Sequence, residues 1–522
     1  MHLNDAKEEM RWKVVLVFAV TLIVYLSFPT RNYYGDGIGF ADDIESAHSD
    51  PSLLFHANHL IYDSVGYVAW KAVQVLQPNV RALSVLQIMD SFFGAASAAV
   101  LCYILYALFD SPYIAVWLSF GFAFSATWWK FSTDADSYTA STFFLITSVL
   151  FLLPSRKSKP TVLALAHTAA MLLHQLALLF YPACVIGLWY QTRKYPLKKR
   201  LAAVAQYSLL ASGMTIAAYV FAFHFTHGTL EPGKMVSWVS SHSYNSAFSF
   251  ELGRNLFTSA AGNVKLFMGG RMRFIQETWG FFIASTAVVA IGFLVMLIWR
   301  LKQTGVPLLQ WPKVRFAPIN RICVVWITVY VVFLVVWLPQ NTFYRLFYLP
   351  ALIVLAGTFI ASSRNRGHTV LALAVGFLFS VNLSSSIYPA SQPVLNHTEQ
   401  FARSMQAVWT PGTIVYGNVY ADENLTIKYF NPQVTWKKLW NHAPLEDLDP
   451  TLHEVRASGK TMWFDLGALE KLSSEEPSFR DWLKANCRLG EKHQFINAND
   501  VVGFVQLVPL NPENSFEHRN AN

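Results

Sequence analysis

Charged residues are scarce in this chain. Only 14% of its 522 residues are Asp, Glu, Lys or Arg, whereas soluble proteins carry about 25%. Of its four cysteines, Cys102, Cys184 and Cys323 fall inside apolar segments, and this pattern offers neither a disulfide framework nor a cysteine metal site. The first apolar segment is followed by Ser27–Arg31, which lacks the small-x-small site of a cleaved signal peptide. We therefore expect that segment to be a retained membrane anchor.

Apolar segments dominate the sequence. Hydrophobic residues make up 53% of the chain, and apolar runs recur from residue 14 to residue 387, which is typical of a multispanning membrane protein. The segment 160–191 is either one long helix or, because both of its flanks are basic, two short helices that turn back near His174-Gln175. With the second interpretation we expect eleven helices, near residues 14–29, 83–108, 112–128, 139–154, 161–173, 176–191, 202–223, 280–299, 322–338, 345–361 and 370–387.

The net charge of +8 comes from short loops between apolar segments and does not indicate nucleic-acid binding. Four of these loops hold fifteen basic residues and no acidic one, which predicts that they face the cytoplasm. With an odd number of spans, the N-terminus is then cytoplasmic and the C-terminal tail lies outside, in a multi-pass protein of the plasma (inner) membrane. The basic residues are Arg156, Lys157, Lys159, Arg193, Lys194, Lys198, Lys199, Arg200, Arg300, Lys302, Lys313, Arg315, Arg321, Arg364 and Arg366.

The expected fold class is an α-helical polytopic membrane protein with a small C-terminal extracytoplasmic α/β domain. Residues 1–387 would form the transmembrane domain, with long outer loops at 30–82 and 224–279. Residues 388–522 change sharply to charged, Asn- and Pro-containing sequence. Their apolar runs predict strands and helices, and 513–522 is expected to be disordered. The expected strands are Thr413–Tyr416, Thr461–Phe464 and Val501–Val508, and the expected helices are 396–408 and 466–485.

The first outer loop contains an acidic cluster. Asp36, Asp42, Asp43 and Glu45 lie within ten residues, just after the first apolar segment. Carboxylates are costly near hydrocarbon, so a cluster at the membrane boundary suggests a place where lipid-borne chemistry meets water. Two other interpretations remain open: an Asp in a Gly-rich turn is a natural helix N-cap, and some of these carboxylates could belong to a solvated face.

The same loop continues with a polar group of four residues, His56, Asn58, His59 and Tyr62. In a helix, His56 and His59 would share one face. With a nearby carboxylate they could bind a metal ion. Hydrogen bonding to phosphate or sugar hydroxyls and a purely structural role are the alternatives.

Further polar residues map to the same outer side of the membrane. Asp134, Asp136 and Tyr138 lie between two apolar segments, and His174 lies at the expected turn of 160–191. Arg345 begins an apolar segment and can pair with a phosphate through two hydrogen bonds or extend to lipid headgroups. N-capping by one of the aspartates and a structural role for His174 are the alternatives.

These stretches resemble the GT-C superfamily of integral membrane glycosyltransferases, which use polyprenyl-phosphate sugars, and in particular bacterial members similar to protein mannosyltransferases and family 39. The topology of residues 10–387 resembles that superfamily too. The motifs that carry the resemblance are Gly35–Phe40 with Ile44-Glu45, Phe55–Tyr62, Asp136–Tyr138 and Asn341–Arg345.

The resemblance implies that one sugar is transferred from a polyprenyl-phosphate donor to a lipid, glycan or protein acceptor at the outer face, with inversion at the anomeric carbon. Asp36 would be the general base. The family often has an acidic pair in this loop, so Asp42 and Asp43 stay as alternative catalytic residues. The implied substrate-binding residues are Glu45, His56, Asn58, His59, Tyr62, Asp136, Tyr138, His174 and Arg345. No cofactor is required, and a divalent metal is possible but not indicated.

Two other function classes use similar substrates. A non-catalytic transporter or flippase of a lipid-linked saccharide would need polar groups near mid-membrane, whereas the expected helices are largely free of charge at their centres. An O-antigen ligase or polymerase typically relies on Arg and His without a first-loop carboxylate. The acidic cluster at the outer rim therefore favours the glycosyltransferase.

Overall fold

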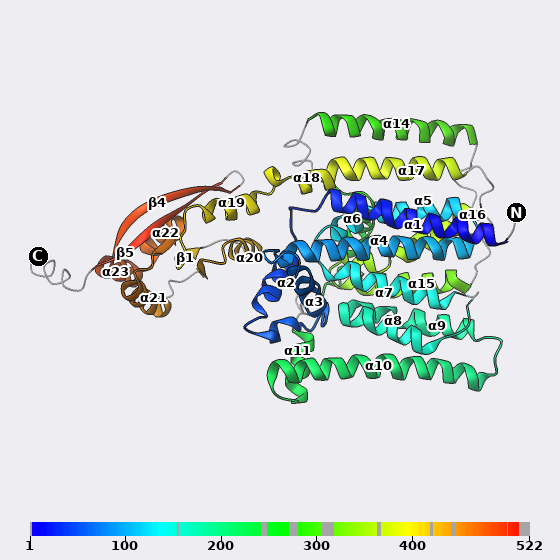
Figure 1. Cartoon of the computed structure of the whole chain (residues 1–522), viewed down its shortest axis with the longest axis horizontal. Coiled ribbons are helices and arrows are strands. Elements are labelled where there is room, and N and C mark those ends of the chain that lie inside the picture. Colours follow the sequence, from blue (N-terminus) through cyan, green and yellow to red (C-terminus); the bar gives the residue numbers. More distant parts are fainter. Residues whose placement is uncertain are drawn as a thin grey trace, which may run out of the picture. The chain divides into compact units, whose positions relative to one another are not determined.

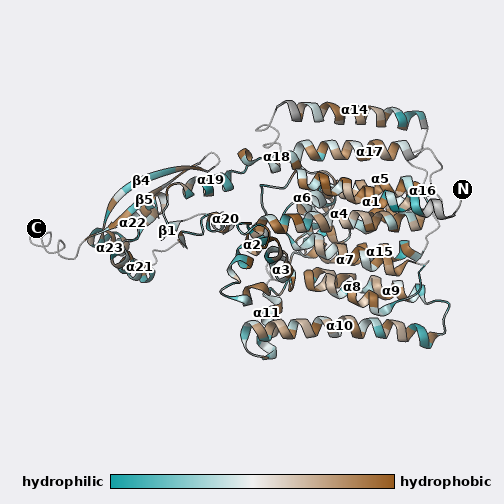
Figure 2. Cartoon of the chain, in the orientation of Figure 1, coloured by the Kyte–Doolittle hydropathy of each residue, from teal (hydrophilic) through white to brown (hydrophobic). Residues whose placement is uncertain are grey.

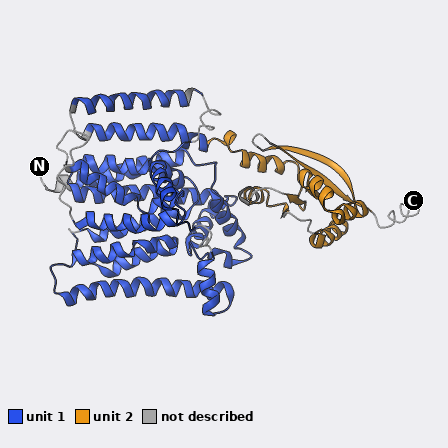
Figure 3. Cartoon of the chain, turned by 180° about the vertical axis from the view of Figure 1, so that it is seen from behind, with its two compact units in different colours: residues 1–391 blue, residues 392–522 orange. Residues whose placement is uncertain are grey.

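The computed structural model describes residues 3–153, 156–241, 248–270, 280–304, 318–362, 367–417, 421–439, 445–497 and 500–510. The chain divides into two compact units, Met1–Ser391 and Gln392–Asn522 (Figure 3). Their boundary lies four residues beyond the one expected from the sequence, at 387. The expectation of disorder at 513–522 falls outside the described residues.

The first unit consists of helices packed side by side (Figure 1). Most of its described helices run along one common direction, and the shorter helices α2, α3 and α6 gather near one end of the bundle. The helices are α1 (Leu3–Ser27), α2 (Gly35–Ser46), η1 (Pro51–Leu54), α3 (Tyr62–Gln74), α4 (Ala82–Phe109), α5 (Pro112–Ala123), α6 (Ala126–Ser132), α7 (Ser137–Leu152), α8 (Pro160–Leu173), η2 (Gln175–Phe180), α9 (Tyr181–Gln191), α10 (Leu197–His227), α11 (Pro232–Ser240), α12 (Leu252–Phe267), α14 (Phe281–Thr304), α15 (Pro318–Val336), η4 (Phe343–Phe347), α16 (Leu349–Ser362), α17 (Gly367–Asn382), η5 (Leu383–Ile387) and α18 (Tyr388–Ser391).

The expectation of a multispanning helical protein is confirmed. Every expected apolar segment coincides with a helix or with two consecutive helices. Among the described residues, six helices are long and apolar enough to cross a membrane, and the bent pair α6–α7, with an angle of 112°, could make a seventh span. The helices α5, α8 and α16 are apolar but shorter. Length and composition therefore do not confirm a count of eleven.

Burial separates central from peripheral spans. In the most apolar 18-residue stretch of α4, half of the residues are buried within the protein. In the corresponding stretch of α14, only 11% are buried. Small residues of α4, such as Gly94, Ala98 and Ser97, are fully or nearly fully buried, which lets neighbouring helices approach closely. Figure 2 shows that hydrophobic residues prevail along α10, α14 and α17.

The segment 160–191 turns back on itself, as the basic flanks predicted. Helix α8 ends at Leu173, and the chain continues through the short helix η2 into α9. The side-chain amide of Gln191, at the end of α9, donates to the carbonyl oxygens of Phe151, Leu153 and Arg156. The end of α9 therefore lies beside the loop from which α8 began.

Three of the basic loops meet at one end of the bundle. Arg156 donates to Tyr103 Oη at the distance of 3.3 Å, and Gln191 reaches the Arg156 carbonyl. Arg321 donates to the hydroxyl of Tyr190 at 2.8 Å. Helix α1 begins at this end, while α2 and α3 lie at the opposite one (Figure 1).

The second unit contains a mixed sheet of five strands in the order β2-β1-β3-β5-β4. Strand β1 pairs in parallel with β2 and β3, so that Ile414 lies beside Thr435 and Met462. Strand β5 pairs antiparallel with β3 and β4. All residues of β1 and β3 are buried, and both strands have a neighbouring strand on each side. The elements are η6 (Pro393–Leu395), α19 (His397–Gln406), β1 (Ile414–Gly417), α20 (Ala421–Phe430), β2 (Thr435–Lys438), α21 (Leu445–Ser458), β3 (Met462–Asp465), α22 (Leu466–Glu475), α23 (Pro477–Asn486), β4 (Cys487–Asn497) and β5 (Asp500–Pro509).

The small C-terminal α/β unit is confirmed. The three expected strands correspond to β1, β3 and β5, and the expected helices to α19 and to α22 followed by α23. The sequence analysis did not predict β2, β4, α20 or α21.

Candidate active site

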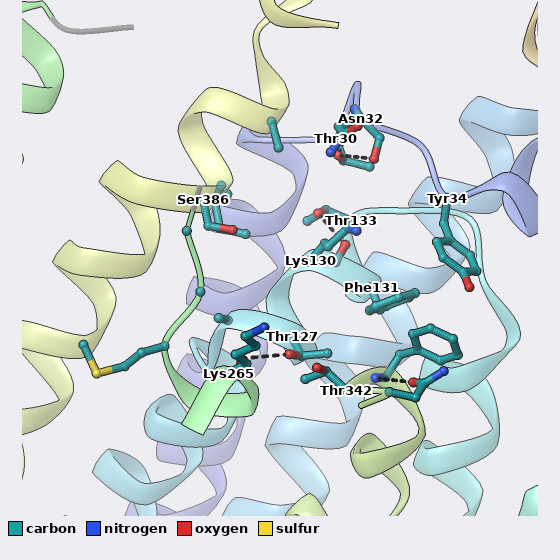
Figure 4. A pocket seen from close by; sticks show the side chains of 18 of the residues that line it. Thr30, Asn32, Tyr34, Thr127, Lys130, Phe131, Thr133, Lys265, Thr342 and Ser386 are labelled. Atoms are coloured by element: carbon teal, nitrogen blue, oxygen red, sulfur yellow. Dashed lines mark hydrogen bonds between the residues drawn. The ribbon is translucent and has the colours of Figure 1, made fainter. Parts of the chain in front are cut away.

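A pocket of about 550 Å³ opens at the end of the bundle where α1 finishes (Figure 4). Its walls come from the segment after α1, from α6, from the end of α12, from the turn before η4, and from η5 and α18. Two lysines line it: Lys130 from α6 and Lys265 from α12. The hydroxyl of Thr127 donates to the carbonyl of Lys265, and this bond joins α6 to α12 across 138 residues of sequence.

One wall of the pocket depends on an irregular turn. Helix α17 gives way to a π-helical turn, η5, which places Ser386 at the pocket. The Asn382 side chain donates to the carbonyls of Phe124 and Phe267, and its oxygen accepts from the Gly269 amide. Such π-helical turns occur frequently at functional sites.

Asp36 lies in the first turn of α2 and is exposed. The sequence left open that Asp36 caps this helix, but the N-cap residue is Tyr34 and no side chain caps the helix. Gly37 packs directly on the carbonyl oxygen of Ala135, where a Cβ atom would collide. Asp36 is therefore held beside the segment that joins α6 to α7.

That segment contributes two buried carboxylates. Asp134 accepts the backbone N–H of Tyr34 at 2.9 Å, which ties the start of α2 to the break between α6 and α7. Asp36 lies near enough for its charge to act on both Asp134 and Asp136. Because Tyr34 also lines the pocket, the acidic residues and the two lysines belong to one region of the protein.

Behind this region lies a buried carboxylate, Asp90, in α4. It accepts hydrogen bonds from Tyr62 Oη at 2.6 Å, from the Asp136 amide at 2.6 Å and from Thr139 Oγ1 at 2.8 Å. Tyr62 therefore positions the short helix α3 against α4. The substrate-binding role expected for Tyr62 stays a prediction, and its hydroxyl is already committed to Asp90.

A second polar cluster lies between α2 and α3. His56 Nε2 is 3.1 Å from Asp43 Oδ2 and 3.4 Å from Asp63 Oδ2. His59 is almost fully buried, and its ring packs against Phe40. Burial raises the pKa of the Asp63 carboxyl well above its usual value, and the nearby charge of Asp43 raises it further.

The other expected site residues of the first loop have partners within the protein. Glu45 accepts from the Arg81 guanidinium and from the Ala82 amide, and so anchors α2 to the start of α4. The backbone carbonyl of Asn58 accepts a hydrogen bond from the backbone N–H of Gln175. Asp42 lies on α2 and is half-buried.

Tyr138 and His174 belong to an aromatic cluster. Their ring centroids are 5.0 Å apart, and the Tyr138 ring also stacks on Phe343, which lines the pocket. His174 Nδ1 accepts from the Leu176 amide and caps the short helix η2. This geometry gives His174 a structural partner and places Tyr138 directly behind the pocket wall.

Arg345 is fully buried in η4. Its guanidinium donates to Tyr348 Oη at 2.9 Å, to Ser259 Oγ at 3.1 Å and to the Pro339 carbonyl at 2.7 Å. It lies against Gly262 of α12, where a Cβ atom would come within 2.5 Å of Nε. A phosphate could reach this guanidinium only by displacing protein groups, so the geometry favours a structural role.

Several residues of this region were not chosen from the sequence. Lys130 and Asp134 lie close to Asp136 and Tyr138 in the sequence. Asp90 is a carboxylate inside an apolar run, where an ionisable residue is rare and indicates a functional or paired group. Asp63 follows His59 by four residues and lies in the first turn of α3. Nothing in the sequence around Lys265 indicates that it lies at the same pocket as Lys130.

Two crystal structures of ArnT from Cupriavidus metallidurans resemble this chain, one bound to undecaprenyl phosphate and one in the apo state. Their TM-scores are 0.58 and 0.60, with 12% sequence identity, and each match covers 94% of this chain and 97% of ArnT. The chain has the fold of ArnT. No protein-family model and no curated protein sequence matches it.

The likeness to ArnT confirms the GT-C resemblance at the level of the fold. It extends over nearly the whole of both chains, so the helical unit and the smaller α/β unit both fall within the shared architecture.

Proposed function

We propose that this protein is a membrane glycosyltransferase that moves a sugar from a polyprenyl-phosphate donor to an acceptor hydroxyl at the outer face of the membrane. One observation carries the proposal: groups that could bind a phosphate and groups that could accept a proton lie in one region. Two lysines line a pocket, and carboxylates lie beside it. The ArnT-like fold supports the donor class, since ArnT binds undecaprenyl phosphate in one of its crystal structures.

Asp36 is the general base of this proposal. It is exposed at the beginning of α2, whereas Asp134 and Asp136 are buried. The acceptor oxygen forms a bond to the anomeric carbon, while the bond from that carbon to the phosphate oxygen breaks. The acceptor proton goes to Asp36 and the electron pair leaves with the polyprenyl phosphate. A single displacement of this kind inverts the anomeric configuration.

Lys130 and Lys265 would bind the donor phosphate and stabilise the charge that it gains on departure. Lys130 also lies over the rings of Tyr34 and Phe131, at 5.9 and 5.3 Å from their centroids. These contacts hold its side chain at the pocket wall. The acceptor class, whether lipid, glycan or protein, stays open in this proposal.

The pocket lies where α1 ends, whereas the three basic loops lie at the end of the bundle where α1 begins (Figure 1). If those loops are cytoplasmic, as the positive-inside pattern predicts, the pocket opens on the outer side. The apolar helices α1 and α17, which lead to the pocket, would let the polyprenyl chain stay in the bilayer while its phosphate enters the pocket.

Transfer by the purified full-length protein tests the proposal. Polyprenyl-phosphate donors with different labelled sugars are incubated with lipid, glycan and peptide fractions, and the released polyprenyl phosphate is measured. We expect release with at least one donor and a decrease of about 10²- to 10⁴-fold for Asp36→Asn, the range typical of losing a general base.

The control is Asp110→Asn, which makes the same chemical change at the C-terminal end of α4, away from the pocket. Asp110 has a left-handed backbone conformation that Asn also adopts. If Asp42→Asn or Asp43→Asn abolishes release and Asp36→Asn does not, the base is wrongly assigned. Donor movement across liposomes without any release would instead favour a flippase.

A further inference from the structure

Three side chains with metal-binding atoms converge between α2 and α3, outside the pocket. Asp43 comes from α2, His56 from the segment before α3, and Asp63 from the first turn of α3. One ligand atom of each lies within 4.8 Å of the other two, and His56 Nε2 is 3.1 and 3.4 Å from the two carboxylates. A tetrahedral ion with bonds of about 2.0–2.2 Å separates its ligand atoms by about 3.3–3.6 Å.

Asp63 provides an independent observation. Its side chain is 0% exposed, and within the described part of the chain neither of its oxygens accepts a hydrogen bond. Burying a carboxylate without such partners is unfavourable. Because His56 Nε2 carries at most one proton, it cannot satisfy both Asp43 and Asp63. A divalent cation would contact all three ligand atoms and balance the two carboxylate charges.

We propose that Asp43, His56 and Asp63 bind a divalent first-row transition-metal ion, of the Zn²⁺ or Mn²⁺ class. A mixed set of one imidazole and two carboxylates suits these ions better than Mg²⁺ or Ca²⁺, which prefer oxygen ligands alone. Asp43 and His56 are partly exposed, at 26% and 30%, and provide a route by which an ion enters from solvent.

The ion would lock the first outer loop. Asp36 and Asp43 are seven residues apart and share one face of α2, so an ion that holds Asp43 also fixes the helix that carries Asp36. Asp63 follows Tyr62, which is bonded to Asp90. The ion therefore connects α2, α3 and α4, and its role is to position the loop. This inference does not depend on the proposed function.

Metal content of the full-length protein tests the inference without any activity measurement. After removal of its affinity tag, the detergent-purified protein is dialysed against Zn²⁺ or Mn²⁺ and then against buffer, and bound metal is measured by mass spectrometry. We expect about one ion per chain. The variants His56→Ala and Asp63→Asn should bind the metal ion at least about 10- to 100-fold more weakly. Loss of a group that only hydrogen-bonds to a metal ligand already lowers metal affinity that much.

His48→Ala is the matched control, because His48 is an exposed histidine of the same loop, and it should bind like the wild type. A chelator should lower the melting temperature of the wild type and of His48→Ala but not that of His56→Ala. If Asp63→Asn does not fold, the partly exposed Asp43→Asn gives the same measurement. A wild-type protein without stoichiometric metal, or variants that keep it, would overturn the inference.

Discussion

Tyr62 Oη donates a hydrogen bond of 2.6 Å to Asp90 Oδ2, and this bond joins the short helix α3 to the long helix α4. Both side chains are fully buried. The same Asp90 oxygen accepts the amide of Asp136. One carboxylate therefore fixes both the segment 30–82, which carries Asp36, and the break between α6 and α7, which lies beside Asp36.

We expect Tyr62→Phe to destabilise the protein by about 1.5–3 kcal/mol, because it removes a donor from a buried carboxylate while keeping the ring. Thermal unfolding of the purified protein in detergent measures the effect. Tyr67→Phe is the matched control on the same helix, where the half-buried ring packs against Trp70. Equal melting temperatures for the two variants would show that the Tyr62 bond does not stabilise the loop.

Lys130→Met and Lys265→Met test phosphate binding at the pocket. Each variant loses one charge-assisted hydrogen bond to the donor, worth about 1.5–3 kcal/mol, so the donor KM should rise about 10- to 100-fold. Donor titration of the purified variants measures the change. Lys234→Met serves as the control, since Lys234 lies on α11, is paired with Glu231 and is not among the residues that line the pocket.

An unchanged donor KM for both pocket variants would remove the lysines from the proposed mechanism. If only one of them raises KM, the phosphate lies nearer to that side of the pocket. Lys130→Arg should retain more activity than Lys130→Met, because it preserves the positive charge.

Much of the fold follows from the apolar runs, and the deviations have physical causes. The run 202–223 predicts a helix that the structure extends to Leu197–His227, because long basic side chains tolerate the membrane boundary. The run 112–128 divides into α5 and α6 at Phe124-Ser125. Strand β2, with the sequence Thr435–Lys438, was not predicted, because it is a short edge strand with two lysines.

The candidate site was predictable only in part. Local clusters indicated the first outer loop, and Asp36 keeps its assignment as a proposal. The sequence could not show that Arg345 would be buried among protein acceptors, or that Lys265 would lie at the pocket beside Lys130. Both facts depend on how α12 packs against α6 and η4, and contacts between distant segments leave no local pattern in the sequence.

The orientation of the protein is a further expectation. The basic loops predict a cytoplasmic N-terminus and an outer C-terminal unit. A reporter that is active only outside the cytoplasm, fused after Asn522, should therefore be active, and the same reporter inserted after Lys194, in a basic loop, should be silent. Activity in the reverse pattern would put the pocket on the cytoplasmic side and contradict the proposed site of transfer.

Arg345→Lys separates a structural arginine from a phosphate-binding one. The guanidinium donates to three protein oxygens at once, and lysine, with a single nitrogen, cannot reproduce that planar arrangement. We expect the variant to lose about 1.5–3 kcal/mol of stability, since hydrogen bonds to a charged group are worth that much. Its donor KM should stay the same, because the partners of Arg345 are already within the protein.

Thermal unfolding and donor titration of one purified preparation distinguish the two roles of Arg345. Arg254→Lys is the control, because Arg254 is exposed on α12 and pairs only loosely with Glu251, at 3.4 Å. A raised donor KM at unchanged melting temperature would support the phosphate role that the sequence left open and the family resemblance implied. It would require Arg345 to leave Ser259 and Pro339 when the donor binds. A lowered melting temperature with an unchanged KM would leave Lys130 and Lys265 as the phosphate ligands of the proposed reaction.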